Sequence, residues 1–217
     1  PYITMMLVGA AFVLIYTLLG GFLAESASDF MQAIVMVVVL VAVLTLGVAN
    51  AGGLGAVFEN VKDFPGFLEF FGIADPVTEG GVQLAVNGVP SFGARQDYGA
   101  LNVASMLAWG LGYFGMPQVL LRFMGIRSEK ELGRSRRVAI IWVTISMAAA
   151  VLIGVVGRSV AGLDYLTNSD AENIFIDAAT MYLPPLLAGF ACAGVLAAAI
   201  SSSDSYLLIA ASAVSQN

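Results

Sequence analysis

Histidine is absent from the 217-residue sequence, and cysteine occurs once, at Cys192. The lack of histidine excludes Ser-His-Asp and Cys-His catalysis and histidine-ligated zinc, and a single cysteine excludes an intrachain disulfide framework and a thiolate metal cluster. Charged residues make up 11% of the chain, well below the roughly 25% of a soluble domain. The net charge is −6, and no basic face is interleaved with aromatic residues, which argues against a nucleic-acid partner.

Hydrophobic residues account for 59% of the chain and gather in long uncharged runs. A bilayer core about 30 Å thick is crossed by a helix of about 20 predominantly apolar residues. Five runs approach this length and predict transmembrane helices at about residues 2–19, 30–48, 101–123, 138–156 and 184–211. We therefore expect an all-α, multi-pass membrane protein in contact with the lipid bilayer, in which residues 1–217 are a fragment of a single transmembrane domain.

Basic residues predict the orientation, because short cytoplasmic loops are enriched in lysine and arginine. Six of the nine basic residues lie at the end of the third predicted span or just after it: Arg122, Arg127, Lys130, Arg134, Arg136 and Arg137. The loop at residues 124–137 is therefore expected on the cytoplasmic side, and its charges are interpreted mainly as a topology determinant. Alternation then places the acid-rich loops at residues 51–99 and 158–183 outside, and a hinge at residues 20–28 inside.

The long outer loop at residues 51–99 is expected to contain local structure. Residues 82–86, Asn87-Gly88 and residues 89–92 predict a hairpin with a type I′ turn, although Pro90 weakens the second strand. Residues 56–71 predict one or two short helices, interrupted at Pro65.

The third predicted span contains three glycines and a proline within residues 109–117. Pro117 removes a backbone hydrogen bond and glycine lowers helix propensity, so a continuous helix is disfavoured. The functional interpretation is a broken helix that lines a cavity, with Trp109, Tyr113 and Pro117 sharing one face at i, i+4 and i+8. The alternative is close helix packing through small residues with an ordinary proline kink.

The fifth predicted span contains four serines and a carboxylate at residues 201–205. A carboxylate near the middle of the bilayer costs roughly 2.5–3.5 kcal/mol and is usually paired or functional. Ser201, Asp204 and Ser205 lie at i, i+3 and i+4, on one face, and offer only oxygen ligands, which hard cations such as Na⁺ prefer. The alternative, a helix interface held by serine hydrogen bonds, leaves Asp204 without a partner.

Two acidic residues near the start of the second predicted span have simple interpretations. Asp29 stands where an acidic side chain stabilises the free N–H groups and the dipole of a helix N-terminus. Composition alone does not assign Asp29 to an ion. Glu25 is interpreted as a solvated charge of the hinge.

Three separated blocks resemble the sodium/solute symporter family, and most closely its sodium/proline symporter branch. The first block is residues 20–24 (Gly-Gly-Phe-Leu-Ala) with residues 28–32 (Ser-Asp-Phe-Met-Gln). The second is residues 108–115 (Ala-Trp-Gly-Leu-Gly-Tyr-Phe-Gly) with Pro117 and residues 122–124 (Arg-Phe-Met). The third is residues 196–198 (Leu-Ala-Ala) with residues 201–205 (Ser-Ser-Ser-Asp-Ser) and the two leucines that follow Tyr206. Glu25 departs from the pattern, because the family has an apolar residue there.

The resemblance implies a leucine-transporter type of fold, in which two inverted repeats of five helices surround a site near the membrane midplane. Residues 1–217 would supply the last two helices of the first repeat and the first three of the second. The resemblance also implies a location in the plasma membrane, Na⁺ as the coupling ion, and a small organic solute, proline or similar, as the substrate.

The resemblance further implies roles for individual residues. Half of the main sodium site would come from the carbonyl of Ala198 and from Ser201 and Ser202. A second sodium position would use Asp29 with Ser201, Asp204 and Ser205, which would give Asp204 a partner. The substrate would lie against Trp109, Tyr113 and Pro117.

Other functions compete with sodium-coupled proline transport. Met116 and Gln118 replace more polar or ionisable residues common beside Pro117, so another amino acid or an organic acid is an alternative substrate. A solute-sensing membrane module of a signalling protein is a second class. An intramembrane enzyme is disfavoured, because Asp29 and Asp204 are the only carboxylates near the spans with polar neighbours, and a purely structural bundle predicts no dependence on ions.

Overall fold

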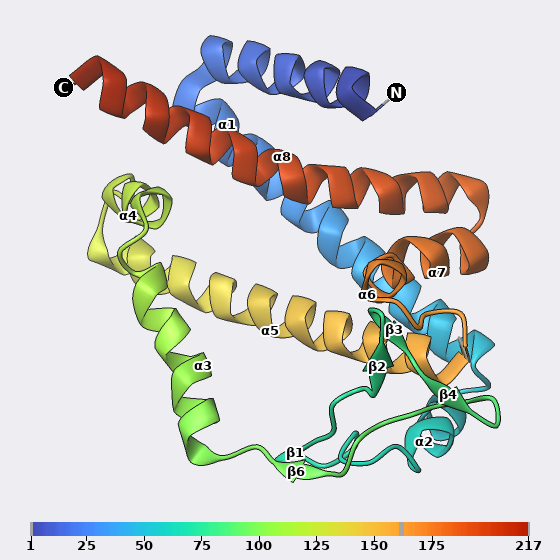
Figure 1. Ribbon diagram of the computed structural model, residues 1–217. Coiled ribbons are helices and arrows are strands. Elements are labelled where there is room, and N and C mark those ends of the chain that lie inside the picture. The colour runs from blue at the N-terminus through green and yellow to red at the C-terminus, as the bar shows by residue number, and fades with distance from the viewer. Residues whose placement is uncertain (1, 161–162, 217) are drawn as a thin grey trace. The chain divides into compact units, whose positions relative to one another are not determined.

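A computed structural model describes residues 2–160 and 163–216, and most of these residues are helical (Figure 1). The helices are α1 (Tyr2–Asn50), α2 (Leu54–Val61), α3 (Ala100–Tyr113), α4 (Pro117–Met124), α5 (Glu129–Val160), α6 (Asn168–Ala171), α7 (Ile174–Tyr182) and α8 (Pro185–Gln216). The strands are β1 (Gly72–Ile73), β2 (Thr78–Glu79), β3 (Val82–Gln83), β4 (Ala85–Val86), β5 (Val89–Pro90) and β6 (Gln96–Asp97). The described residues are therefore mainly helical, as expected, and the short strands lie in the loop between α2 and α3.

Three helices of the described residues are long and apolar enough to cross a membrane, at Ile3–Asn50, Glu129–Val160 and Pro185–Ser215. The first contains 48 residues, which corresponds to about 70 Å of helix at 1.5 Å per residue. That length is about twice what one crossing of a 30 Å hydrocarbon core requires. Large apolar side chains along these helices are mostly exposed, as expected for surfaces that face lipid or further helices.

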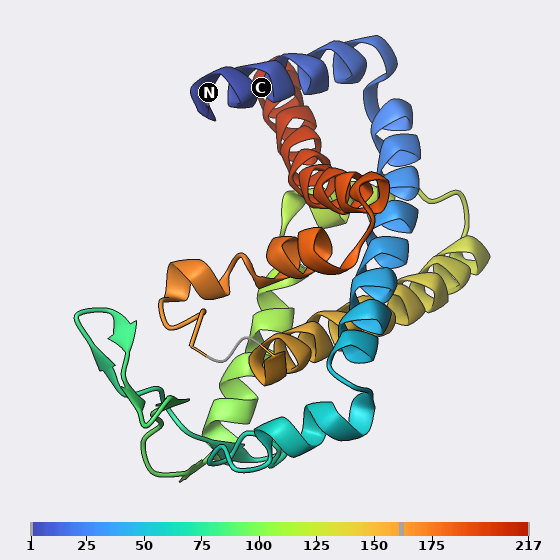
Figure 2. The same cartoon turned by 90° about the vertical axis from the view of Figure 1, so that its right-hand side faces the viewer.

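Gly21 divides α1 into two arms, which leave the bend in different directions (Figures 1 and 2). Its backbone angles, φ 53° and ψ −146°, are adopted almost only by glycine. The prediction of a hinge over residues 20–28 is wrong in extent, because every residue of that range except Gly21 continues a helix. Asp29 therefore lies inside the second arm and not at a helix N-terminus, so capping does not explain it.

The predicted break in the third apolar run is present. α3 ends at Tyr113 and α4 begins at Pro117, which occupies the first turn of α4, where the missing N–H costs nothing. Trp109 and Tyr113 remain one turn apart on α3, but the break takes Pro117 out of that helical register. α3 has 14 residues and α4 has 8, so neither alone has the length of a membrane crossing.

The predicted basic loop is shorter than expected, because α5 begins at Glu129. Ser128 and Glu131 have the Ser-x-x-Glu spacing of a capping box, and the Glu131 amide donates to the Ser128 hydroxyl at 3.4 Å. Acidic residues in the first turn of α5 also stabilise its helix dipole. The capping residue and the acidic first turn therefore stabilise a helix start at Glu129, within residues 124–137 that were predicted as a loop.

The predicted turn at Asn87-Gly88 is confirmed, but the hairpin is shorter than predicted, because β3 pairs with β2 instead of extending the first strand. β4 and β5 pair antiparallel with Val86 opposite Val89, so that Asn87 and Gly88 form a two-residue turn. Both turn residues have positive φ, 52° and 79°, as a type I′ turn requires. Pro90 pairs at the far end of this short ladder, opposite Ala85. The predicted short helix is present as α2, which buries Val57 and Val61.

The chain divides into two compact units. The first unit contains residues 1–39, 112–142 and 189–217, and the second contains residues 40–111 and 143–188. In the described part of the first unit, Glu25, Asp204 and Ser205 are buried alongside apolar residues such as Val13 and Ala191. The core of the second unit is mainly apolar, with Val43, Val57, Val61, Ile153, Val156 and Ala179. Both carboxylate side chains that are buried in the described residues, Glu25 and Asp204, therefore belong to the first unit.

Replacing Gly21 with alanine is expected to lower the free energy of unfolding by about 1–3 kcal/mol, because alanine tolerates this φ and ψ poorly. A Cβ at Gly21 would meet nothing within 4 Å, so the cost is conformational and not steric. Gly9 in the first arm is the matched control, since its Cβ would also enter open space. Gly9→Ala is expected to be neutral or to stabilise by up to about 1 kcal/mol. Equal effects of the two variants in thermal unfolding of the purified protein would contradict this role of Gly21.

Candidate functional site

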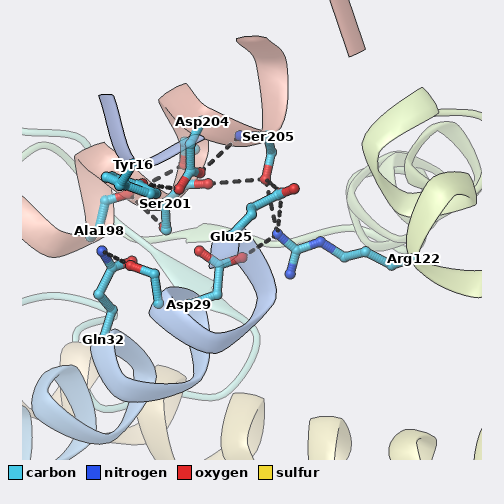
Figure 3. A network of polar contacts seen from close by, with 11 residues as sticks. Tyr16, Glu25, Asp29, Gln32, Arg122, Ala198, Ser201, Asp204 and Ser205 are labelled. Carbon is cyan, nitrogen blue, oxygen red and sulfur yellow. Dashed lines mark hydrogen bonds and ion pairs between the residues drawn. The ribbon is translucent and has the colours of Figure 1, made fainter. Parts of the chain in front are cut away.

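Asp204 on α8 is fully buried, with 0% of its surface exposed, and both of its carboxylate oxygens accept hydrogen bonds (Figure 3). The Tyr16 hydroxyl, from the first arm of α1, donates to Oδ2. The Ser205 backbone N–H donates to Oδ1 at 2.8 Å. Sequence reasoning expected Asp29 to be the partner and did not find Tyr16. The available signal was a tyrosine inside an otherwise apolar, uncharged run.

Glu25 is 2% exposed, which corrects its interpretation as a solvated hinge charge. Its Oε1 lies 2.6 Å from the Ser205 hydroxyl oxygen, within reach of the hydroxyl proton. The same hydroxyl lies 3.0 Å from the Ser201 carbonyl, so its single proton has two possible acceptors. Glu25 and Asp29 are separated by one helical turn on the second arm of α1, which places both carboxylates on the same face. No feature of the composition distinguishes such a glutamate from an exposed one.

Arg122 on α4 joins these groups through one nitrogen (Figure 3). Its Nη2 donates to Asp29 Oδ2, donates to the Ser205 hydroxyl oxygen at 2.9 Å and lies 3.5 Å from Glu25 Oε1. The Arg122 side chain is 49% exposed, so the cluster is open to solvent on this side in the described chain. Arg122 is therefore more than a topology determinant, because it connects α4 to α1 and α8.

The cluster carries more negative than positive formal charge. Glu25, Asp29 and Asp204 contribute three carboxylates and Arg122 contributes one guanidinium, so the sum is −3 + 1 = −2. Two carboxylate oxygens, Glu25 Oε2 and Asp29 Oδ1, are buried and accept no hydrogen bond from the residues that the structure describes. Buried carboxylate oxygens without donors favour the approach of a cation.

Two further oxygens on α1 are in the same situation. Thr17 Oγ1 and Gln32 Oε1 are buried and have no hydrogen-bond partner among the described residues. The amide nitrogen of Gln32 donates to the Ser28 hydroxyl at 3.0 Å, which fixes the orientation assigned to the amide group. Every unpartnered buried oxygen in the described part of the first unit thus belongs to α1.

The residues of the predicted main sodium site lie together on α8. The Ser201 and Ser202 hydroxyls donate to the Ala198 carbonyl at 3.0 and 3.3 Å. Each hydroxyl keeps its lone pairs for another partner. Ser203 makes the same kind of bond to the Ala199 carbonyl, at 2.9 Å, one residue further round the helix. Within residues 2–160 and 163–216, no three or more carboxylate or cysteine side chains are arranged to hold a metal ion.

The predicted substrate residues are separated along the chain by the helix break. Trp109 and Tyr113 are 72% and 55% exposed, and Pro117 begins α4. Trp109 belongs to the second compact unit, whereas Tyr113 and Pro117 belong to the first, so their grouping into one site stays a prediction. Next to Pro117, the Gln118 side-chain amide donates to the Tyr206 hydroxyl at 3.4 Å, which links α4 to α8.

Comparison with curated proteins shows relatives that are named as proline transporters. The osmoregulated proline transporter OpuE of Bacillus subtilis is 34% identical over 208 residues, 95% of this chain and 37% of that protein. The high-affinity proline transporter PutP of Bacillus subtilis is 34% identical over 202 residues, 93% of this chain and 38% of that protein. A sodium/proline symporter of Staphylococcus aureus is 30% identical over 208 residues, 96% of this chain and 36% of that protein.

The chain spans less than two fifths of the length of these relatives. No solved structure gives a significant match. The model of the sodium:solute symporter family matches residues 1–217, which is the whole chain. This match and the three long apolar helices identify an integral protein of the plasma membrane. The chain belongs to the sodium:solute symporter family.

Proposed function

We propose that the chain is part of a secondary transporter, not an enzyme, that couples the Na⁺ gradient to the uptake of a small organic solute, with proline as the substrate. The observation that carries this proposal is the family match over residues 1–217, with relatives named as proline transporters or sodium/proline symporters. In this proposal the two arms of α1, the broken pair α3 and α4, α5, and α8 are five spans of a leucine-transporter type of fold.

The main sodium site is proposed to take the Ala198 carbonyl and the Ser201 and Ser202 hydroxyls as half of its ligands. Neighbouring oxygens around an ion with metal–oxygen distances of about 2.4 Å lie about 3.4 Å apart. The separations from the carbonyl to the two hydroxyls, 3.0 and 3.3 Å, are close to this value. Ser202 is exposed and Ser201 is partly exposed, so an ion and the remaining ligands have access to this face.

The second sodium position is proposed at Asp29, Ser201, Asp204 and Ser205. The Arg122 side chain competes with Na⁺ for the oxygens of this position. The Arg122 guanidinium already contacts Asp29 and Ser205, two of these ligands. A guanidinium and Na⁺ cannot occupy the same oxygens at once, so Na⁺ binds here only when Arg122 withdraws. The half-exposed arginine side chain has a path to solvent for that movement.

Coupled transport then requires that Na⁺ and the solute favour the same conformation of the protein. Na⁺ at Ser201 and Ser202 stabilises an outward-open state, and the solute closes the broken α3–α4 segment over itself. Because both ligands favour the same conformer, each raises the affinity of the other by the same factor. Asp29 lies on the predicted cytoplasmic side, and Na⁺ leaves it for the cytoplasm when Arg122 binds Asp29 again.

Removing either hydroxyl of the main sodium site is expected to weaken Na⁺ binding. Ser201→Ala and Ser202→Ala should each raise the Na⁺ concentration for half-maximal proline uptake about tenfold, the effect of losing about 1.4 kcal/mol of binding free energy. Ser203→Ala is the matched control, because Ser203 bonds to a different carbonyl, that of Ala199. The measurement is Na⁺-dependent proline uptake by the full-length protein in vesicles. Unchanged Na⁺ dependence in both variants would remove this assignment.

Removing the tethered guanidinium is expected to strengthen Na⁺ binding at the second position. Arg122→Gln should lower the Kd for Na⁺ about two- to fivefold, since a partly exposed ion pair is worth up to about 1 kcal/mol. Arg127→Gln is the control, because Arg127 makes no ion pair with any described carboxylate. Calorimetric titration of Na⁺ into the purified full-length variants measures the change. Weaker Na⁺ binding in Arg122→Gln, with folding intact, would show that the arginine supports the site and does not compete for it.

Truncating the Tyr113 side chain is expected to weaken proline binding much more than Na⁺ binding. Tyr113→Ala should raise the Kd for proline at least about tenfold and change the Kd for Na⁺ much less, because Tyr113 is proposed to contact only the solute. Phe114→Ala is the comparison, since Phe114 is a similarly exposed ring at the same break. Both constants come from binding assays at saturating concentrations of the other ligand. A larger effect on Na⁺ than on proline would refute this placement of the substrate.

A further inference from the structure

Arg158 lies in the last turn of α5 and has no counter-charge among the residues that the structure describes. The second compact unit contains three basic residues, and two of them form ion pairs at the surface, Lys62 with Glu59 and Arg95 with Glu69 and Asp97. Arg158 forms no salt bridge with any carboxylate that the structure describes. Its Nε and Nη2 are buried and have no hydrogen-bond acceptor there. A buried charged donor without a partner is costly, so an anion is expected to complete this arrangement.

The two unsatisfied nitrogens lie on the same edge of the guanidinium. Nη2 is the terminal nitrogen trans to Cδ, so its N–H and the Nε N–H point in parallel. This edge forms paired hydrogen bonds with the two oxygens of a carboxylate. The unsatisfied donors therefore have the geometry of a carboxylate receptor.

Two phenyl rings hold the guanidinium in place. Arg158 Cζ lies 5.4 Å from the centroid of Phe64 and 5.8 Å from that of Phe92. The two rings also contact each other, with centroids 5.3 Å apart. Cation–π contacts of this kind stabilise the charge through the ring faces but provide no acceptor for the N–H groups. The rings thus position the arginine, whose Nε and Nη2 have no acceptor among the described side chains and backbone.

A cavity of about 550 Å³ adjoins Arg158. Its lining includes Phe92, Val155, Thr78, Gln83 and Tyr165, which give it apolar walls with a few polar groups. Small-molecule sites typically have volumes of about 300–1,000 Å³ and this mixture of residues. The volume far exceeds that of a halide ion and accommodates a small organic molecule.

Neighbouring groups do not satisfy the arginine. The Tyr165 hydroxyl donates to Asp177 Oδ2 at 3.0 Å, which engages that carboxylate. Burial and this hydrogen bond raise the pKa of Tyr165 to about 12, so the hydroxyl keeps its proton at neutral pH. The partial negative charge at the C-terminus of α5 favours a cation in the last turn. That attraction does not supply acceptors for Nε and Nη2, which have none in the described part of the chain.

We propose that this cavity binds a small organic carboxylate with an apolar body, and that Arg158 binds its carboxylate through Nε and Nη2. The site is separate from the residues proposed for Na⁺ and substrate, and it does not depend on the transport function. The predicted orientation places this end of α5 on the outer side, where dissolved carboxylates reach it directly.

Calorimetric titration of the full-length protein in a Tyr113→Ala background tests the site while solute binding at the proposed transport site is weakened. The probe is cyclopentanecarboxylate, the neutral control ligand is cyclopentanecarboxamide, and sodium chloride tests for an inorganic anion. Arg158→Gln is expected to raise the Kd for the carboxylate at least about tenfold. Arg95→Gln, which removes a surface arginine of the same unit, is expected to leave the Kd unchanged.

Arg158→Lys keeps the positive charge but removes the paired N–H groups of the guanidinium. This variant replaces Arg158→Gln in the test if the glutamine variant does not fold. A single ammonium cannot present two parallel N–H groups, so its Kd should lie between those of Arg158 and the glutamine variant. The thermal midpoint without ligand verifies folding of each variant. The proposal is overturned by absence of carboxylate binding, by equal binding of the carboxamide, by binding of chloride with no preference for the carboxylate, or by an unchanged Kd in folded Arg158→Gln or Arg158→Lys. Each of these outcomes is independent of Na⁺-dependent proline uptake.

Discussion

The burial of Asp204 within an apolar helix is the constraint on which the first unit depends. A fully buried carboxylate requires donors, and its own helix supplies only the Ser205 backbone N–H. The other donor, Tyr16, comes from the first arm of α1, while Glu25 reaches Ser205 from the second arm. A straight α1 could not present residues of both arms to the same part of α8, so the bend at Gly21 is part of the solution.

The buried polar groups of the two units have opposite local imbalances, a surplus of carboxylates around Ser205 in the first unit and an unpaired guanidinium at Arg158 in the described part of the second. In the first unit, two carboxylates contact the Arg122 guanidinium, and Glu25 Oε2 and Asp29 Oδ1 have no donors among the described residues. In the second unit, Arg158 has two buried donors and no carboxylate within the described residues. Buried imbalance is expensive, and proteins retain it where a ligand supplies the missing charge. The first imbalance suits a cation, and the second suits an anion.

Helix interruptions place the polar groups where they can act. The α3–α4 break follows the glycines of α3 and ends at Pro117, and the bend of α1 rests on one glycine with a positive φ. A Cβ at Gly21, or at Gly110 or Gly112 of α3, would meet nothing within 4 Å, so side-chain packing does not require glycine at these positions. Arg122 on α4 and Glu25 beyond the α1 bend meet at Ser205, so both interruptions lead to the same cluster.

The sequence by itself determined the features that depend on near neighbours in the chain. The apolar runs, the break before Pro117, the type I′ turn at Asn87 and Gly88, and the serine face of α8 all follow from local spacing and backbone preference. Only the tertiary structure decided which polar groups meet. Tyr16 and Asp204 are 188 residues apart in the sequence, and Glu25 and Ser205 are 180 apart. The burial of Glu25 and the choice of Tyr16 as a partner depend on how α1 packs against α8, and no local pattern encodes the position of a distant helix.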